Sequence, residues 1–100
     1  MIEIKAKKLS SWKEKSEGLL SSKKATPIFF KTRFGIHTFF MKFPIDVVII
    51  ERSGRVITFR EKISPNKLYI WNPIYNGVLE LPSGEIKRLK IKRGTQIKLV

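Results

Sequence analysis

The sequence predicts a mainly β protein: a small closed or nearly closed antiparallel barrel or sandwich of about seven or eight short strands, with one or two short helices. Turn signals made of Gly, Pro, Asn and Ser recur roughly every 8 to 12 residues. The runs between them are short and rich in β-branched and aromatic residues. No long helical pattern connects successive strands, which argues against a parallel α/β sheet.

The first half of the chain predicts three strands and one helix. Alternating or continuous apolar residues indicate strands at Met1 to Lys5, Pro27 to Lys31 and His37 to Met41. Between the first two, Ser11 and Glu14 form a capping-box pattern, which predicts a short helix from Trp12 to Leu20. Pro44 ends the third strand because proline removes a backbone donor.

The second half holds the strongest β signal, Val47 to Glu51, which begins with four consecutive β-branched apolar residues. The turn at Arg52-Ser53-Gly54 and the alternation from Arg55 to Lys62 predict a hairpin with that strand. Further strands are expected around Leu68 and Ile70, at Val78 to Leu81, and at Thr95 to Val100. Glu85 to Lys90 is expected to form one or two helical turns.

Length and composition indicate a single domain over residues 1–100. The absence of cysteine excludes disulfides and thiolate chemistry. No apolar run approaches the roughly 20 residues of a membrane span. The N-terminus has no signal-peptide core, so a cytoplasmic location is expected. The formal net charge of +13 is typical of proteins that bind nucleic acid or an anionic surface, but it also suits solubility.

Four segments occur in order between Pro27 and Leu99: "GIHTFFMKFPIDVVII", "GRVI", "VLELPSG" and "IKRG". As a set they resemble the domain of unknown function 192 family. The resemblance implies a compact, mostly β fold with a minor helix, and no established biochemical activity. Some members look exported, which implies that the +13 charge belongs to this member or its host. Thr95 stands where relatives often carry an acid, and Ser83 where alanine is common.

A ligand site is one interpretation of the residues around the single histidine of the chain. The candidates are His37, Met41, Asp46 and Glu80. An Asp–His pair could orient an imidazole, and a buried Glu80 needs a partner. The structural alternatives are that Asp46 accepts backbone hydrogen bonds at the start of a strand, that Glu80 pairs with a cation, and that Met41 belongs to the core.

A basic cluster near the C-terminus suggests a second kind of site. It comprises Lys87, Arg88, Lys90, Lys92 and Arg93. Phosphate binding by this cluster would need aromatic side chains nearby for base stacking, and Trp71 and Tyr75 are the candidates. The alternative is a solvated face, with basic residues spread over several sides of the molecule and not gathered in one groove.

Two functions remain open from the sequence. The first is a small β module that binds a small ligand or a protein partner; the second is a nonspecific nucleic-acid-binding protein with a basic surface. Enzymatic activity is the least favoured, because no nucleophile or metal-ligand spacing is present. Accordingly, no catalytic residue, cofactor or metal is expected. The sequence leaves the oligomeric state undefined.

Overall fold

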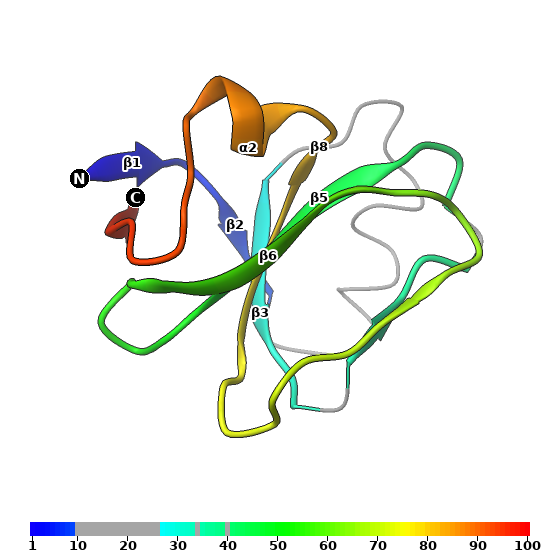
Figure 1. The fold of residues 1–100 in the computed structure, drawn as a ribbon, viewed down its shortest axis with the longest axis horizontal. Helices are drawn as coiled ribbons and strands as arrows, with labels where there is room; N and C mark the ends of the chain where they lie inside the picture. The colour runs from blue at the N-terminus through cyan, green and yellow to red at the C-terminus, as the bar shows by residue number, and fades with distance from the viewer. Residues whose placement is uncertain (10–26, 34, 40) are drawn as a thin grey trace.

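The computed structural model describes residues 1–9, 27–33, 35–39 and 41–100. A five-stranded sheet lies at its centre (Figure 1). In spatial order the strands are β2 (Lys7–Lys8), β3 (Ile28–Lys31), β8 (Gly77–Pro82), β5 (Ile45–Ile50) and β6 (Val56–Ile63). The pair β2–β3 is parallel, and the other neighbours are antiparallel.

Two small ribbons and a helix cover this sheet. The strands β1 (Ile2–Ile4) and β9 (Ile97–Leu99) pair in parallel, and β4 (Ile36–His37) pairs with β7 (Leu68–Tyr69) antiparallel. The helix α2 (Glu85–Arg88) follows β8 directly. In Figure 1, β1 lies to the left of the sheet and α2 at its top, whereas residues 36–37 and 68–69 lie to its right. The sheet is therefore covered on both faces.

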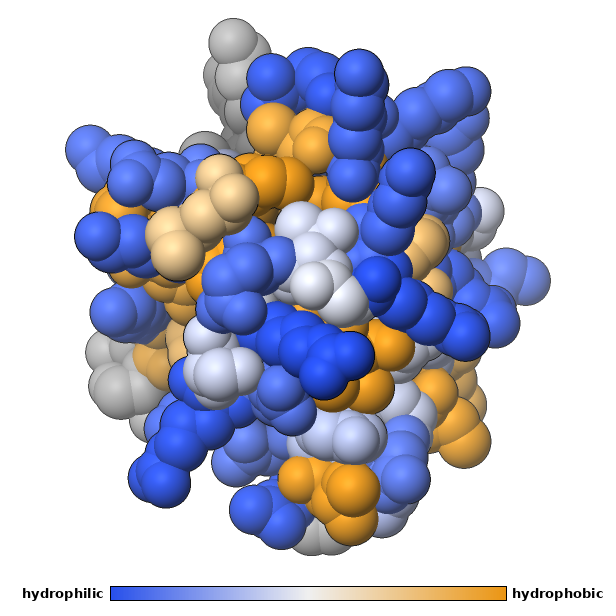
Figure 2. All heavy atoms as spheres, turned by 60° about the vertical axis from the view of Figure 1, so that its left-hand side comes forward, coloured by the Kyte–Doolittle hydropathy of each residue, from blue (hydrophilic) through white to orange (hydrophobic). Residues whose placement is uncertain are grey.

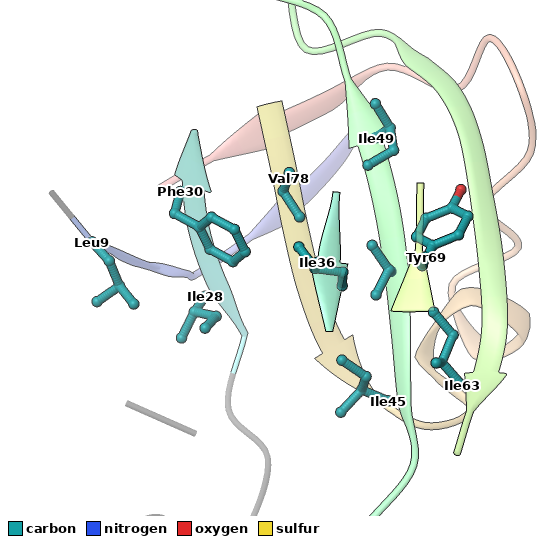
Figure 3. Close-up of a cluster of buried hydrophobic side chains, with 10 residues drawn as sticks. Leu9, Ile28, Phe30, Ile36, Ile45, Ile49, Ile63, Tyr69 and Val78 are labelled. Carbon is teal, nitrogen blue, oxygen red and sulfur yellow. The ribbon is translucent and has the colours of Figure 1, made fainter. Parts of the chain in front are cut away.

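Each face of the sheet has its own core. The first core cluster, drawn in Figure 3, faces the β4–β7 ribbon and contains Leu9, Ile28, Phe30, Ile36, Ile45, Val47, Ile49, Ile63, Tyr69 and Val78. The second core cluster faces β1, β9 and α2 and contains Ile4, Val48, Ile50, Val56, Leu79, Leu81, Ile86, Ile91 and Ile97. Successive residues of β5 and β8 alternate between the clusters. This explains why every residue of β5 is buried.

The β5–β6 hairpin carries a bulge. Ile45 faces Ile63, but Val47 faces Arg60, so two residues of β6 lie opposite Asp46. One of them, Lys62, has a positive φ of 51°. At the other end of the hairpin, Gly54 donates its N–H to the carbonyl oxygen of Glu51 (2.8 Å) and its own carbonyl oxygen accepts from Ile97 (2.9 Å). The hydrogen bond from Ile97 thus connects the hairpin turn to β9.

The predicted mainly β class is confirmed, and the described residues form nine strands. Closure is not observed, since β2 and β6 remain open edges of the described sheet. Two of the strand pairings are parallel, which the antiparallel prediction did not include. The helix predicted at Trp12 to Leu20 lies outside the described residues. The predicted helix at Glu85 to Lys90 is present as the single turn α2.

Candidate functional site

Asp46 is completely buried and its carboxylate is used by the fold. Oδ1 accepts the N–H of Lys62 (2.9 Å), and Oδ2 accepts the N–H groups of Gly84 and Ile86 (3.0 Å each). Lys62 belongs to the bulge of β6, and Gly84 is the N-cap of α2. Because glycine offers no capping side chain, the carboxylate from β5 takes that role for the first turn of the helix. Asp46 therefore joins three segments distant in sequence.

Glu80 is also buried, at 4% exposure, but it lies on the other face of the sheet. In the β5–β8 ladder Asp46 is opposite Leu81, whereas Glu80 is opposite Val47. Directly opposed residues in an antiparallel pair point to the same face. Asp46 consequently shares the face of the second core cluster, and Glu80 that of the first. Glu80 is not without an interaction partner, and neither is His37.

His37 lies on the outer side of β4, opposite Leu68, and its ring stacks on Phe39 with centroids 4.9 Å apart. Three large apolar side chains are exposed near it: Phe39 (41%), Leu68 (69%) and Ile70 (76%). We call these four residues the ribbon face. Met41 is partly buried and packs against the first core cluster. The structure thus does not bring His37, Met41, Asp46 and Glu80 together in one pocket.

The basic cluster and its two aromatic candidates pack against different core clusters, although the charge of Arg93 acts on Tyr69, the ring neighbour of Trp71. The segment that carries the basic cluster packs into the second core cluster through Ile86, Leu89 and Ile91. Its basic residues are Lys87, Arg88, Lys90, Lys92 and Arg93. Trp71 packs against the first cluster, and its Nε1–H donates to the carbonyl oxygen of Tyr75 (2.7 Å). Figure 1 shows α2 at the top and the chain around residue 75 at the bottom.

Arg88 of this basic cluster is engaged locally. Its Nη2 lies 2.6 Å from Oε2 of Glu85, one turn earlier. The hydrogen bond from Arg88 lowers the pKa of the Glu85 carboxyl. This ion pair compensates part of the positive charge of the cluster, which weakens it as a phosphate-binding surface.

A groove with a concentration of positive charge lies elsewhere, between β9, the β5–β6 turn and the lower ends of β3 and β8. We call it the basic groove; its volume is about 1280 Å³. Five cationic side chains line it: Lys8, Lys31, Arg33, Arg52 and Lys98. Among the described lining residues, Glu51 is the one acid, and it accepts a hydrogen bond from Ser53. Figure 2, turned toward the side of β1 and β9, shows hydrophilic and hydrophobic residues interspersed on that face.

The strand register explains the shape of the groove. Lys31, Gly77 and Ile50 lie side by side on three neighbouring strands, and all three line the groove. Gly77 is buried and has no side chain, and Ile50 occupies the space that a Cβ would take there. Phe29 and Tyr75 are partly exposed aromatic residues of the wall. Of the sequence-predicted candidates, only Tyr75 is in this lining.

Sequence reasoning missed the basic groove for a physical reason. Its five cations come from residues 8 to 98 of the chain, and no two of them are adjacent in sequence. Each looks like an ordinary solvated lysine or arginine beside a strand. The C-terminal cluster attracted attention because it is dense in sequence, although density in sequence does not produce a concave surface.

The described residues form neither a metal-binding cluster nor a helix that could span a membrane. Among residues 1–9, 27–33, 35–39 and 41–100, no three His, Cys, Asp or Glu side chains are grouped so that they could hold a metal ion. Within the same ranges, no helix has the length and apolar character required to cross a bilayer.

Comparison with known proteins gives a family and a fold. The sequence model of the DUF192 family, described as "Uncharacterized ACR, COG1430", matches residues 2–99. No curated protein matches this chain. A "putative transcription regulator" from Sinorhizobium meliloti is similar in structure, with a TM-score of 0.70 at 21% identity over 87% of this chain and 74% of that one. A protein of unknown function from Novosphingobium aromaticivorans has a TM-score of 0.71 at 18% identity, over 89% and 70%. At these identities the likeness shows the fold alone.

Proposed function

Because this chain belongs to the DUF192 family, whose description assigns no activity, we propose its function from geometry: it is a small β module that binds an anionic partner in the basic groove. The observation that carries this proposal is the lining of the groove, with five cations against one acid. Cations gathered in a concave surface raise the local concentration of anions. Asp46 then has a structural role, because its oxygens already accept three backbone hydrogen bonds.

The charge of the groove can be separated from the charge of the whole molecule. We define a groove-lysine variant with Lys8→Gln, Lys31→Gln and Lys98→Gln, and a control-lysine variant with Lys5→Gln, Lys42→Gln and Lys67→Gln. All six lysines are exposed, and only the first three line the groove. Each variant lowers the formal net charge of +13 by three.

Titration calorimetry with short-chain inorganic polyphosphate tests the proposal. At low salt, the groove-lysine variant is expected to bind at least about tenfold more weakly than the wild type, since three charge-assisted contacts are lost. The control-lysine variant should lose about twofold or less. Equal losses in both variants, or no binding by the wild type, would contradict a groove-specific site.

A protein partner is the second candidate function, and the ribbon face favours it. Leu68 and Ile70 flank the buried Tyr69, so their exposed side chains point to the same side, next to His37 and Phe39. Contiguous exposed apolar surface marks interaction sites. A second copy of this chain is a simple occupant, because an isologous interface needs one self-complementary patch.

Sedimentation velocity over a range of salt concentrations tests self-association through the ribbon face. The dimer is expected to be more populated at high salt, because screening weakens the repulsion between two chains of charge +13. The double variant Leu68→Thr, Ile70→Thr should be monomeric, whereas Val100→Thr, which removes another exposed apolar residue, should not change the dimer. A monomer under all conditions contradicts this candidate.

A further inference from the structure

We propose that the anionic partner of the basic groove is a single-stranded nucleic acid, with phosphates near the groove cations and bases stacked on Phe29 and Tyr75. This inference rests on the proposed function and adds the chemical class of the partner. Proteins that bind single strands without sequence preference combine a positive groove with aromatic platforms.

The cations surround the groove instead of forming a single row. Lys8 and Phe29 are register partners on β2 and β3, and Lys31 follows Phe29 by two residues, so all three side chains share one face. Lys98 comes from β9 and Arg52 from the β5–β6 turn, on the other walls. A flexible polyanion that lies across this face therefore meets cations from four separate elements.

The two aromatic residues are anchored and accessible at once. Phe29 packs against the second core cluster and Tyr75 against the first, and each is only partly buried. Both residues line the groove. Anchored rings lose little conformational entropy on binding, which favours stacking with bases. An acidic peptide or a lipid headgroup would satisfy the cations but would not use these rings in the same way.

Size and shape favour an extended single strand over two alternatives. The groove volume of about 1280 Å³ exceeds the roughly 300 to 1000 Å³ of small-molecule pockets. Sequence readout of duplex DNA commonly places a helix or a β-ribbon in the major groove. Among the described residues, the one helix is the four-residue α2, and it does not line the basic groove; of the β1–β9 ribbon, only β9 does.

The test uses fluorescence anisotropy with three fluorescein-labelled probes at several salt concentrations. The probes are an oligothymidylate 12-mer, an abasic 12-mer with the same number of phosphates, and a 12-base-pair duplex. For the oligothymidylate, the slope of log K against log salt is expected to approach about −3.5, from about 0.7 for each of up to five neutralised phosphates. The groove-lysine variant should reduce the magnitude of the slope by about 2. The control-lysine variant should keep the wild-type slope.

The aromatic contribution is tested with Phe29→Leu and Tyr75→Leu, which keep an apolar side chain in the core. Each is expected to weaken oligothymidylate binding by about tenfold, as loss of one stacked base does, without weakening the abasic probe. Phe59→Leu, which changes a partly buried ring of the second core cluster outside the groove, should leave both affinities unchanged. Thermal melts of every variant identify losses that come from unfolding.

The possible results distinguish this inference from the function beneath it. If the abasic probe binds as tightly as oligothymidylate, or the duplex binds more tightly, the single-strand assignment is overturned while polyphosphate binding can still support an anion-binding groove. If neither polyphosphate nor any probe binds, both proposals fail. The inference is supported if the wild type binds oligothymidylate more tightly than the abasic and duplex probes, and if only Phe29→Leu and Tyr75→Leu lose this preference.

Discussion

Asp46→Ala is expected to lower the free energy of unfolding by about 3 to 5 kcal/mol, the typical cost of removing one partner of a buried charged interaction. The substitution removes the acceptor of three hydrogen bonds and leaves the N–H groups of Lys62, Gly84 and Ile86 without it. At about 4 to 8 °C per kcal/mol for a domain of this size, the melting temperature should fall by roughly 12 to 40 °C.

Asp46→Asn separates charge from shape. Its amide keeps one oxygen but turns a donating NH₂ group toward either Lys62 or the start of α2, so about 2 to 4 kcal/mol should be lost. Glu61→Ala is the matched control, because Glu61 is an exposed carboxylate on the neighbouring strand; its loss should cost less than about 0.5 kcal/mol. Denaturant unfolding measures all three. An Asp46 variant as stable as the wild type, or more stable, would overturn the structural role and restore the ligand interpretation.

Gly54→Ala is expected to cost about 2 to 4 kcal/mol through two effects. Gly54 has a φ of 90°, a conformation that alanine rarely adopts. A Cβ at this position would also overlap the carbonyl oxygen of Ile97. The hairpin turn would have to move away from β9, which breaks the hydrogen bond from Ile97 to Gly54. Because both segments line the basic groove, polyphosphate affinity should fall as well.

Gly94→Ala measures the first effect alone. Gly94 has nearly the same φ, 88°, but no heavy atom lies within 4 Å of a Cβ built there. This variant should cost about 1 kcal/mol from backbone strain alone. The difference between the two substitutions, measured by denaturant unfolding, reports the contact with β9. Equal costs would show that the hairpin and β9 are not held as closely as the structure indicates.

The central strands were predictable because their residue types strongly favour one conformation, a buried β-strand. Val47 to Ile50 are four consecutive β-branched apolar residues, and all four side chains can be buried only in a strand that is covered on both faces. Gly54 marks the turn that follows. The parallel pairing of Ile2–Ile4 with Ile97–Leu99 left no such signal. It depends on which edges remain open after the central sheet has formed, and local patterns do not encode that choice.

The candidate site was less accessible to sequence reasoning. Alternation correctly placed Glu80 on the face of Val78, but it could not show that Asp46 faces the opposite side, because the relative register of β5 and β8 is a tertiary property. The structural interpretation of Asp46 followed from its place at the start of a strand. The hydrogen-bond partners of its carboxylate lie up to 40 residues away in sequence and could not be inferred from that position.

The pairing of β1 with β9 has a consequence for synthesis of the chain on the ribosome. Ile2 cannot meet Ile97, nor Ile4 meet Leu99, until the last of these residues has left the exit tunnel. During elongation, apolar residues of the second core cluster therefore have an incomplete cover, although β5, β6 and β8 can already pair. Contacts of such long sequence separation form slowly. Completion of this core must therefore wait for β9, and a nascent chain stalled before residue 97 would present an aggregation-prone surface.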